Sequence, residues 1–210
     1  MLGTTSSDDQ LFITNTTGAN PTQTAAGFPI GFTFYYNGAS YTRFGVSMNG
    51  YIMLGNLPTF VMPAYGSGNF GLPASGTINV NNGIALFANS NIISALNYDL
   101  IGQAGSTLQC ITTGTAPSRV LTVQWSGVTS FGKTGNFNFQ IKLYEANTIE
   151  FCYGSFTHDA TLEDARVGLY GSSNADFLMK TGSTSWTAVT NGTTSGASVA
   201  FNNTVFQQMD

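Results

Sequence analysis

NFNFQIKLYE, residues 136–145, is the stretch with the clearest structural pattern in this chain. Large apolar side chains stand at every second position, and Asn, Gln and Lys stand between them. A period of two is typical of a β-strand with one buried and one solvent-exposed face. The stretch therefore predicts a half-buried strand whose inward side chains include Phe137, Phe139 and Ile141.

The segments before and after this stretch repeat the alternation. The positions expected to face inward are Leu121, Val123 and Trp125 in Val120–Trp125, and Ile149, Phe151 and Tyr153 in Thr148–Tyr153. Three consecutive half-buried strands joined by turns predict an antiparallel meander.

Hairpin signals lie further upstream, where Asn37-Gly38 and Asn49-Gly50 each stand between β-branched or aromatic residues. Asn-Gly favours a hairpin because both residues tolerate the positive φ of a type I′ turn. No segment shows sustained helical periodicity, and the best candidate, His158–Ala165, is short enough to be a turn. The chain is therefore predicted to be all-β, a two-sheet antiparallel sandwich of jelly-roll or meander type with very little helix.

The composition is that of a folded domain with an unusually neutral surface. Hydrophobic residues make up 42% of the chain, which excludes disorder and predicts a packed core. The length of 210 residues predicts one domain over residues 1–210, with polar extended segments at roughly 1–27 and 187–210. Charged residues make up only 8%, against roughly 25% in typical soluble domains. A surface of Thr, Ser, Asn, Gln and Gly is what we expect of an extracellular or cell-surface protein.

The charge and hydropathy of the chain argue against a nucleic-acid partner and against a membrane span. The formal charge of −4 is spread along the chain without a basic cluster, so nucleic acid is not an expected partner. No apolar run approaches the ~20 residues of a membrane span. MLGTTSSDDQ, residues 1–10, lacks the basic and apolar regions of a signal peptide, so we expect a secreted protein to carry this chain as a mature or excised part.

The range Asn56–Asn82 has weak strand character, is rich in Gly, Pro and Ser, and carries Phe60, Tyr65 and Phe70. Long loops in compact domains are often functional, and aromatic rings are common contacts for sugars and proteins. These three residues are our candidate ligand-binding residues, with Tyr65 and Phe70 at the centre. The alternative is that the rings fold back and cap one end of the sandwich.

Residues 127–134, GVTSFGKT, match the phosphate-binding loop pattern G-x-x-x-x-G-K-[ST]. That loop binds phosphate between a buried parallel strand and a helix whose N-terminus faces the phosphate groups. Here an amphipathic strand follows the motif. We therefore interpret the match as accidental, in a hairpin loop between two antiparallel strands.

No catalytic, metal or cofactor site is predicted. His158 is the only histidine, so the chain can form neither a serine triad nor a zinc site without help from cysteine. The acids that follow it have no recognised calcium-loop spacing. Two carboxylates suffice for glycoside hydrolysis, and Glu145 and Glu150 are the obvious pair, but they flank a turn where charged residues are ordinary.

Cys110 and Cys152 are the two cysteines. A simple meander places their strands about three spacings of ~4.8 Å apart, too far for a disulfide unless the residues face each other across two sheets. The sequence leaves this disulfide open.

The order of several blocks resembles a known module. IGFTFYYNGASYTRFGVSMNGYIMLG, LNYDL, GTAPSRVLTVQW, FNFQIKLYEANTIEFCYG, VGLYGSSNADF and SW follow one another from Ile30 to Trp186. The series resembles a β-sandwich module of large bacterial secreted and cell-surface proteins, and it is similar to the nidogen-type extracellular domain. The resemblance implies an adhesin-like, non-enzymatic surface role, and it supplies no binding residues.

Four residues are expected to be structural parts of that scaffold. Asp99 and Arg119 are interpreted as a partly buried ion pair, and Trp125 and Phe139 as core. Only one acid, Asp99, stands where the family pattern often has an acidic doublet, which weakens any metal role there.

These observations predict a non-catalytic extracellular interaction or adhesion module that binds a glycan or an extracellular protein. One alternative is a self-assembling structural subunit of an extracellular filament or a virion. In that case sheet edges, or the terminal patches Leu11–Ile13 and Val205–Phe206, pair with a neighbouring copy. A second alternative is a secreted glycan-active enzyme or its carbohydrate-binding accessory domain.

Overall fold

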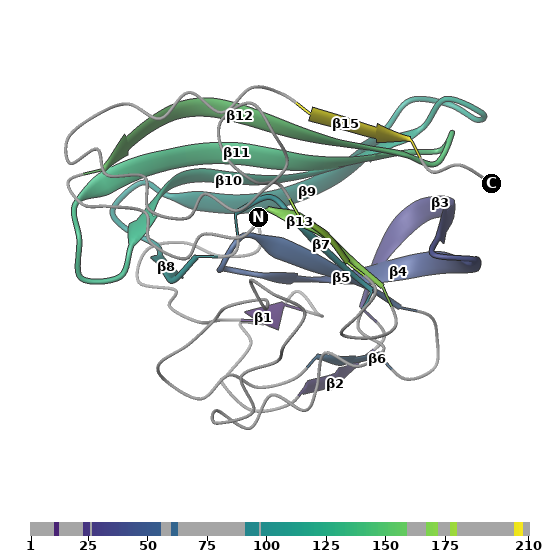
Figure 1. Ribbon diagram of the computed structural model, residues 1–210, viewed down its shortest axis with the longest axis horizontal. Helices are drawn as coiled ribbons and strands as arrows, with labels where there is room; N and C mark the ends of the chain where they lie inside the picture. The colour runs from purple at the N-terminus through teal and green to yellow at the C-terminus, as the bar shows by residue number, and fades with distance from the viewer. Residues whose placement is uncertain are drawn as a thin grey trace.

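The computed structural model describes residues 11–12, 23–25, 27–55, 60–62, 91–96, 98–158, 167–171, 177–179 and 204–207. Two antiparallel sheets lie one above the other (Figure 1). No helix occurs within these ranges. The predicted all-β, two-sheet antiparallel sandwich is confirmed.

The upper sheet in Figure 1 contains the meander that the sequence predicts. Its strands follow the order β15-β12-β11-β10, and β10 pairs in addition with β9 along its first half and with β8 at its end. These strands are β8 (Leu100–Ile101), β9 (Thr107–Thr113), β10 (Val120–Ser130), β11 (Gly135–Tyr144), β12 (Thr148–His158) and β15 (Thr204–Gln207).

The lower sheet follows the order β1-β4-β5-β7-β13-β14, and β3 pairs with β4. Its strands are β1 (Leu11–Phe12), β3 (Phe28–Tyr36), β4 (Ala39–Ser47), β5 (Tyr51–Gly55), β7 (Ile92–Ser94), β13 (Gly168–Tyr170) and β14 (Phe177–Met179). Two further short strands, β2 (Gln23–Ala25) and β6 (Phe60–Met62), pair only with each other among the described elements.

The core fills the space between the two sheets and is built from alternate residues of each strand. Eight residues of β10, β11 and β12 predicted to face inward are all at most 2% exposed: Leu121, Val123, Trp125, Phe137, Phe139, Ile141, Ile149 and Phe151. Burying a side chain of this size contributes about 1.5–3 kcal/mol relative to leaving it in water. The alternation in the sequence therefore identified the buried face correctly, including the two predicted core residues Trp125 and Phe139.

Two aromatic side chains of the upper sheet also form hydrogen bonds to the lower layer. Trp125 Nε1 donates to the carbonyl of Ser47 at 3.1 Å, and the Tyr153 hydroxyl donates to the carbonyl of Ala95 at 2.6 Å. These bonds give partners to polar groups whose burial would otherwise be costly. They also fix the position of one sheet relative to the other.

Both predicted Asn-Gly hairpins are confirmed. Asn37 and Gly38 have φ values of 49° and 72°, the positive values of a two-residue type I′ turn between β3 and β4. Between β4 and β5, Gly50 has φ 86°. The neighbouring Asn49 is fully buried, and its Oδ1 accepts a hydrogen bond from Leu100 N at 2.9 Å. This second turn is therefore part of the core.

The two cysteines are free thiols in the positions that the meander predicts. Cys110 of β9 lies opposite Val123 and shares its inward face, whereas Cys152 of β12 lies opposite Gln140 on the outward face. Two intervening strands and opposite faces both prevent a disulfide. Burial raises the pKa of the Cys110 thiol.

The terminal patches proposed to pair with a neighbouring copy pair within the same chain. Leu11 and Phe12 of β1 lie opposite residues of β4, and Val205 and Phe206 of β15 lie opposite residues of β12. β1 and β15 thus extend the two sheets of their own domain.

Candidate functional site

Of the three aromatic residues predicted to bind a ligand, only Phe60 lies in a described segment. It begins β6, where it is opposite Ala25 of β2. Tyr65 and Phe70 lie outside the described residues. Ligand binding by this loop stays a prediction.

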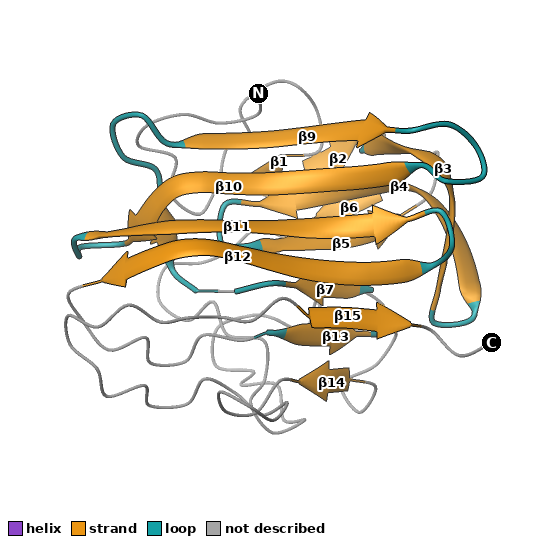
Figure 2. Ribbon diagram, turned by 90° about the horizontal axis from the view of Figure 1, so that it is seen from above, coloured by secondary structure: helices purple, strands orange, loops and turns teal. Residues whose placement is uncertain are grey.

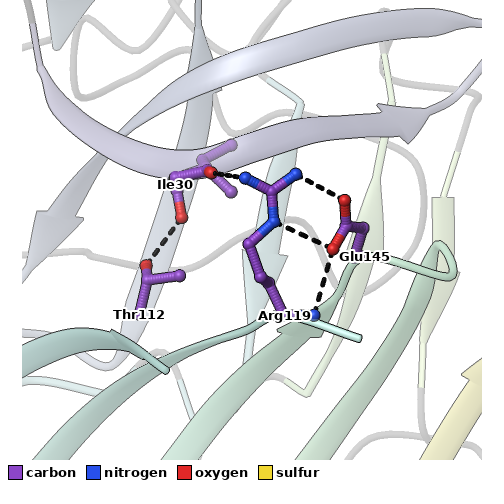
Figure 3. Close-up of polar contacts among 5 residues, drawn as sticks. Ile30, Thr112, Arg119 and Glu145 are labelled. Carbon is purple, nitrogen blue, oxygen red and sulfur yellow. Dashed lines mark hydrogen bonds and ion pairs between the residues drawn. The ribbon is translucent and has the colours of Figure 1, made fainter. Parts of the chain in front are cut away.

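A polar cluster joins the edge of the lower sheet to the upper sheet, and Figure 3 shows it. β3 loses its pairing with β4 in its middle, so the carbonyls there need other partners. Thr112 Oγ1 donates to the carbonyl of Ile30 at 2.6 Å, and Arg119 Nη1 donates to the carbonyl of Gly31 at 2.6 Å. The inter-sheet clasp below means the five residues Ile30, Gly31, Thr112, Arg119 and Glu145.

Glu145 holds Arg119 in place within the clasp. Its Oε2 accepts hydrogen bonds from the Arg119 backbone N at 3.0 Å and from Arg119 Nε at 2.9 Å. The guanidinium also lies over the ring of Phe32, 5.6 Å from its centroid. The side-chain hydrogen bonds from Arg119 lower the pKa of Glu145 to about 2. Both groups are therefore charged at neutral pH, and Glu145 holds the guanidinium that donates across to the carbonyl of Gly31 in the lower sheet.

The predicted ion pair between Asp99 and Arg119 is wrong. Arg119 directly precedes β10, whereas the carbonyl of Asp99 accepts a hydrogen bond from Phe131 N, just after that strand ends. At ~3.3 Å per residue, the length of β10 separates the two side chains by roughly 30 Å. Arg119 pairs with Glu145 because strand pairing places Val120 opposite Tyr144, and these two residues are next in line.

The clasp should make stability depend on acidity. A carboxyl group with a lowered folded-state pKa contributes stability above its unfolded pKa and loses it as pH falls through the folded value. For Glu145 the two values are 4.5 and about 2, so its contribution should decline between them. Urea denaturation of the wild type and Glu145→Gln at several pH values measures this contribution. We expect the gap in free energy of unfolding to be widest near pH 7 and to close toward pH 2, and a constant gap would contradict the assignment.

The phosphate-loop match lies where the sequence analysis places it. Gly127 sits in a bulge of β10, with φ 70°, and Gly132 and Lys133 lie in the turn between antiparallel β10 and β11. The motif is followed by a strand and not by a helix, so backbone N–H groups do not converge on a phosphate position.

Lys133→Ala should therefore leave any ligand binding of this domain unchanged. The side chain is exposed in the turn, so its removal should also change stability by less than about 0.5 kcal/mol. Isothermal titration with ATP and a thermal melt of both proteins would test this. Micromolar ATP binding that disappears in the variant would show that the motif is functional.

The outer face of the upper sheet carries an open depression of about 480 Å³. It lies over β10, β11 and β12, which Figure 2 shows face on. The outward side chains that line it are Gln124, Ser126, Asn138, Gln140, Lys142 and Cys152. The alternate residues of the same strands belong to the core and hold this surface in place. Its volume falls in the range of roughly 300–1,000 Å³ that is usual for small-ligand sites.

Two β-bulges shape this depression. The register between β10 and β11 shifts between Trp125 and Val128, and the register between β11 and β12 shifts between Phe137 and Phe139. Both shifts fall opposite Asn138. Bulges bend a strand and redirect its side chains, so the sheet is locally deformed on both sides of one residue.

Asn138 holds both bulges through its side-chain amide. Its Oδ1 accepts from Gly127 N at 2.9 Å and from the Ser126 hydroxyl at 3.1 Å. Its Nδ2 donates to the carbonyl of Ser155 at 3.1 Å and to Asn136 Oδ1 at 3.0 Å. Because the amide uses both its donors and its acceptor, this part of the surface has a single preferred arrangement.

Sequence reasoning placed Asn138, Gln140 and Lys142 on the wet face but missed the depression. The signal was present as Gly127 and Gly154, since glycine inside a strand often marks a bulge. A Cβ atom at Gly154 would lie 3.3 Å from the Cβ of Asn138. A side chain at this position, on the lining of the depression, would therefore crowd Asn138.

The charges on this face are paired with each other. Lys142 Nζ lies 3.8 Å from Glu150 Oε2, and the same oxygen accepts a hydrogen bond from the Tyr144 hydroxyl at 2.5 Å. Burial, followed by the hydrogen bond and the charge of Glu150, raises the pKa of Tyr144 to about 12. At neutral pH the tyrosine is uncharged, so the face as a whole is close to neutral.

The carboxylate pair considered for glycoside hydrolysis is engaged with other groups. Glu145 is bound to Arg119, and Glu150 is bound to Tyr144 and lies near Lys142. Within the described ranges, no three His, Cys, Asp or Glu side chains come together as a metal site requires. His158 ends β12, and the acids that follow it lie outside those ranges.

Comparison with known proteins gives the family. Searches of curated proteins and of solved structures found no match. Among the residues that the structure describes, no helix could span a lipid bilayer. A family model described as NIDO related matches residues 4–208. This match covers almost the whole chain and agrees with the nidogen-type resemblance of the sequence, so the chain belongs to the NIDO-related family of extracellular-type domains.

Proposed function

We propose that this chain is a non-catalytic interaction module, an adhesin-like part of a secreted or cell-surface protein, which binds a glycan or an extracellular protein. The observation that carries the proposal is the open depression over β10, β11 and β12. A rigid sheet presents its polar groups in a fixed arrangement, so little conformational entropy is lost on binding. Membership of the NIDO-related family supports an extracellular setting.

The environment of the acidic residues supports a role without chemistry. A general acid in glycoside hydrolysis needs a raised pKa, so that it holds its proton near working pH. Arg119 has the opposite effect on Glu145 and lowers its pKa. Glu150, between Tyr144 and Lys142, is also bound to neighbours and does not face an open site alone.

A binding survey tests the proposal. The labelled domain is applied to a glycan array and to a panel of purified extracellular-matrix proteins, and its oligomeric state is measured by size-exclusion chromatography. We expect a folded monomer that binds at least one member saturably. A folded domain that binds no member of either panel would refute the proposal.

The aromatic range Asn56–Asn82 remains a second proposed contact surface. If Tyr65 and Phe70 contact the ligand, Tyr65→Ala and Phe70→Ala should each weaken binding by at least about tenfold, the size expected for losing an aromatic anchor. Their melting temperatures should change little. The opposite result, lower stability with unchanged affinity per folded molecule, would show that these rings cap the sandwich.

A structural subunit is the alternative, and the edge of the upper sheet favours it. Among the described strands β9 pairs only with β10, and its outward residue Ile111 is 62% exposed. Exposed strand edges with apolar side chains are templates for pairing with another copy. In this case chromatography should show concentration-dependent polymers, and Ile111→Lys should reduce them.

A further inference from the structure

The depression contains a pair of amides that are already oriented by each other. Gln140 Nε2 donates to Gln124 Oε1 at 2.6 Å, across the β10–β11 pairing. This bond leaves Gln124 Nε2 as a donor and Gln140 Oε1 as an acceptor, neither of which has a partner among the described residues. The lining of the depression therefore presents both donor and acceptor groups, on two amides that one hydrogen bond joins.

We infer that the depression binds a neutral oligosaccharide, with Gln124 and Gln140 hydrogen-bonded to neighbouring hydroxyl groups of one sugar ring. The inference rests on the proposed function, because it names the ligand of the same surface. A hydroxyl group both donates and accepts, so neighbouring hydroxyls can pair with the donor and acceptor groups of two amides that are joined to each other. An apolar ligand would leave both amide groups without partners, at a cost of about 1–3 kcal/mol each.

The charges of this face select against an acidic glycan. The nearest cation, Lys142, lies 3.8 Å from Glu150, so an added carboxylate or sulfate would meet both charges at once. The other outward lining side chains are the uncharged amides of Gln124, Asn138 and Gln140, the Ser126 hydroxyl and the Cys152 thiol. No cluster of cations is present on this lining to stabilise an anion. A neutral ligand rich in hydroxyl groups can instead form hydrogen bonds with the uncharged polar side chains there.

The surface also has the length and the shape for a chain of sugars. Along β11 the outward residues that line the depression run from Asn138 to Lys142, a distance of roughly 14 Å at ~3.4 Å per residue. Asn138 fixes the bulged end through its hydrogen bonds, and at the other end Lys142 Nζ lies 3.8 Å from Glu150 Oε2. Both ends are held before a ligand arrives, which lowers the entropic cost of binding.

The experiment uses the whole chain and four sets of short neutral oligosaccharides, built from glucose, mannose, galactose or xylose, with oligogalacturonate as the acidic comparison. Affinities are measured by isothermal titration for the wild type, for the double variant Gln124→Ala/Gln140→Ala and for Thr33→Ala. Thr33 is an exposed strand residue of β3, in the other sheet, and serves as the matched control. Thermal melts establish that all three proteins are folded.

We expect at least one neutral set to bind, with at least about tenfold weaker binding in the double variant and no change in Thr33→Ala. Affinity should change by less than about twofold between low and high salt, since no charge pair is formed. The inference fails if no neutral set binds, if the double variant binds as well as the wild type, or if oligogalacturonate binds best. A domain that binds a matrix protein but no sugar would overturn this inference alone, whereas a domain that binds nothing would overturn the proposed function as well.

Discussion

Replacing Phe139 with alanine should lower the free energy of unfolding by about 3–5 kcal/mol, the usual cost of emptying an aromatic core position. The ring is 2% exposed and stacks on Trp125, with centroids 4.9 Å apart and an interplanar angle of 13°. It also contacts Phe156 at 6.2 Å between centroids. Its removal would leave a cavity beside two large rings that strand pairing holds in place. Urea denaturation followed by circular dichroism measures the loss.

Phe131→Ala is the matched control for this prediction. Phe131 is 53% exposed and lies in the turn between β10 and β11, so the same truncation removes few contacts there. We expect a change within about 0.5 kcal/mol. Equal losses in the two variants would mean that Phe139 does not belong to a close-packed core.

Gly31→Ala should cost about 2–4 kcal/mol, because two separate penalties meet at this position. The backbone of Gly31 has φ 93°, a region that L side chains rarely adopt. A Cβ atom would also lie 2.8 Å from Thr112 Cγ2. Any shift that relieved this contact would disturb the hydrogen bonds of the inter-sheet clasp at Ile30 and Gly31.

Two further variants separate these penalties. Gly38→Ala tests positive φ alone, since Gly38 has φ 72° and an added Cβ would meet nothing within 4 Å, so we expect a loss of about 1–2 kcal/mol. Thr112→Ser removes Cγ2 but keeps the hydroxyl that donates to Ile30. Gly31→Ala should therefore cost less in the Thr112→Ser background than in the wild type. A cost that is the same in both backgrounds would show that the clash with Thr112 does not matter.

Much of the upper sheet could be predicted because the relevant pattern is local. Phe137, Phe139 and Ile141 alternate with polar residues within a single strand, and burial of one face follows directly from the period of two. The Asn37-Gly38 hairpin is equally local, because it depends on which residues tolerate positive φ. The disulfide between Cys110 and Cys152, by contrast, stayed open until the strand order and the opposite faces of the two residues were observed.

The residues of the candidate site were harder to predict from the sequence. Gln124 and Gln140 are sixteen residues apart, and they meet only because strand pairing places them opposite each other. Asn138 is one of several polar residues on the wet face, and its role depends on bulges in two neighbouring strands. Gly127 and Gly154 were the available signs of those bulges, but glycine alone does not say which way a strand bends.

Local sequence patterns were enough to predict the fold class, the buried face of β10, β11 and β12, and the two hairpins between β3, β4 and β5. The pairing of Arg119 with Glu145 in place of Asp99 became apparent from the folded chain alone. So did the hydrogen bond from Arg119 to the carbonyl of Gly31, at the β3 edge of the lower sheet. The two groups of features differ in how far apart in the chain the interacting residues lie. Alternation and turn conformation depend on residues next to each other in the chain, whereas the partner of a charge or a carbonyl depends on which strands the whole fold brings together.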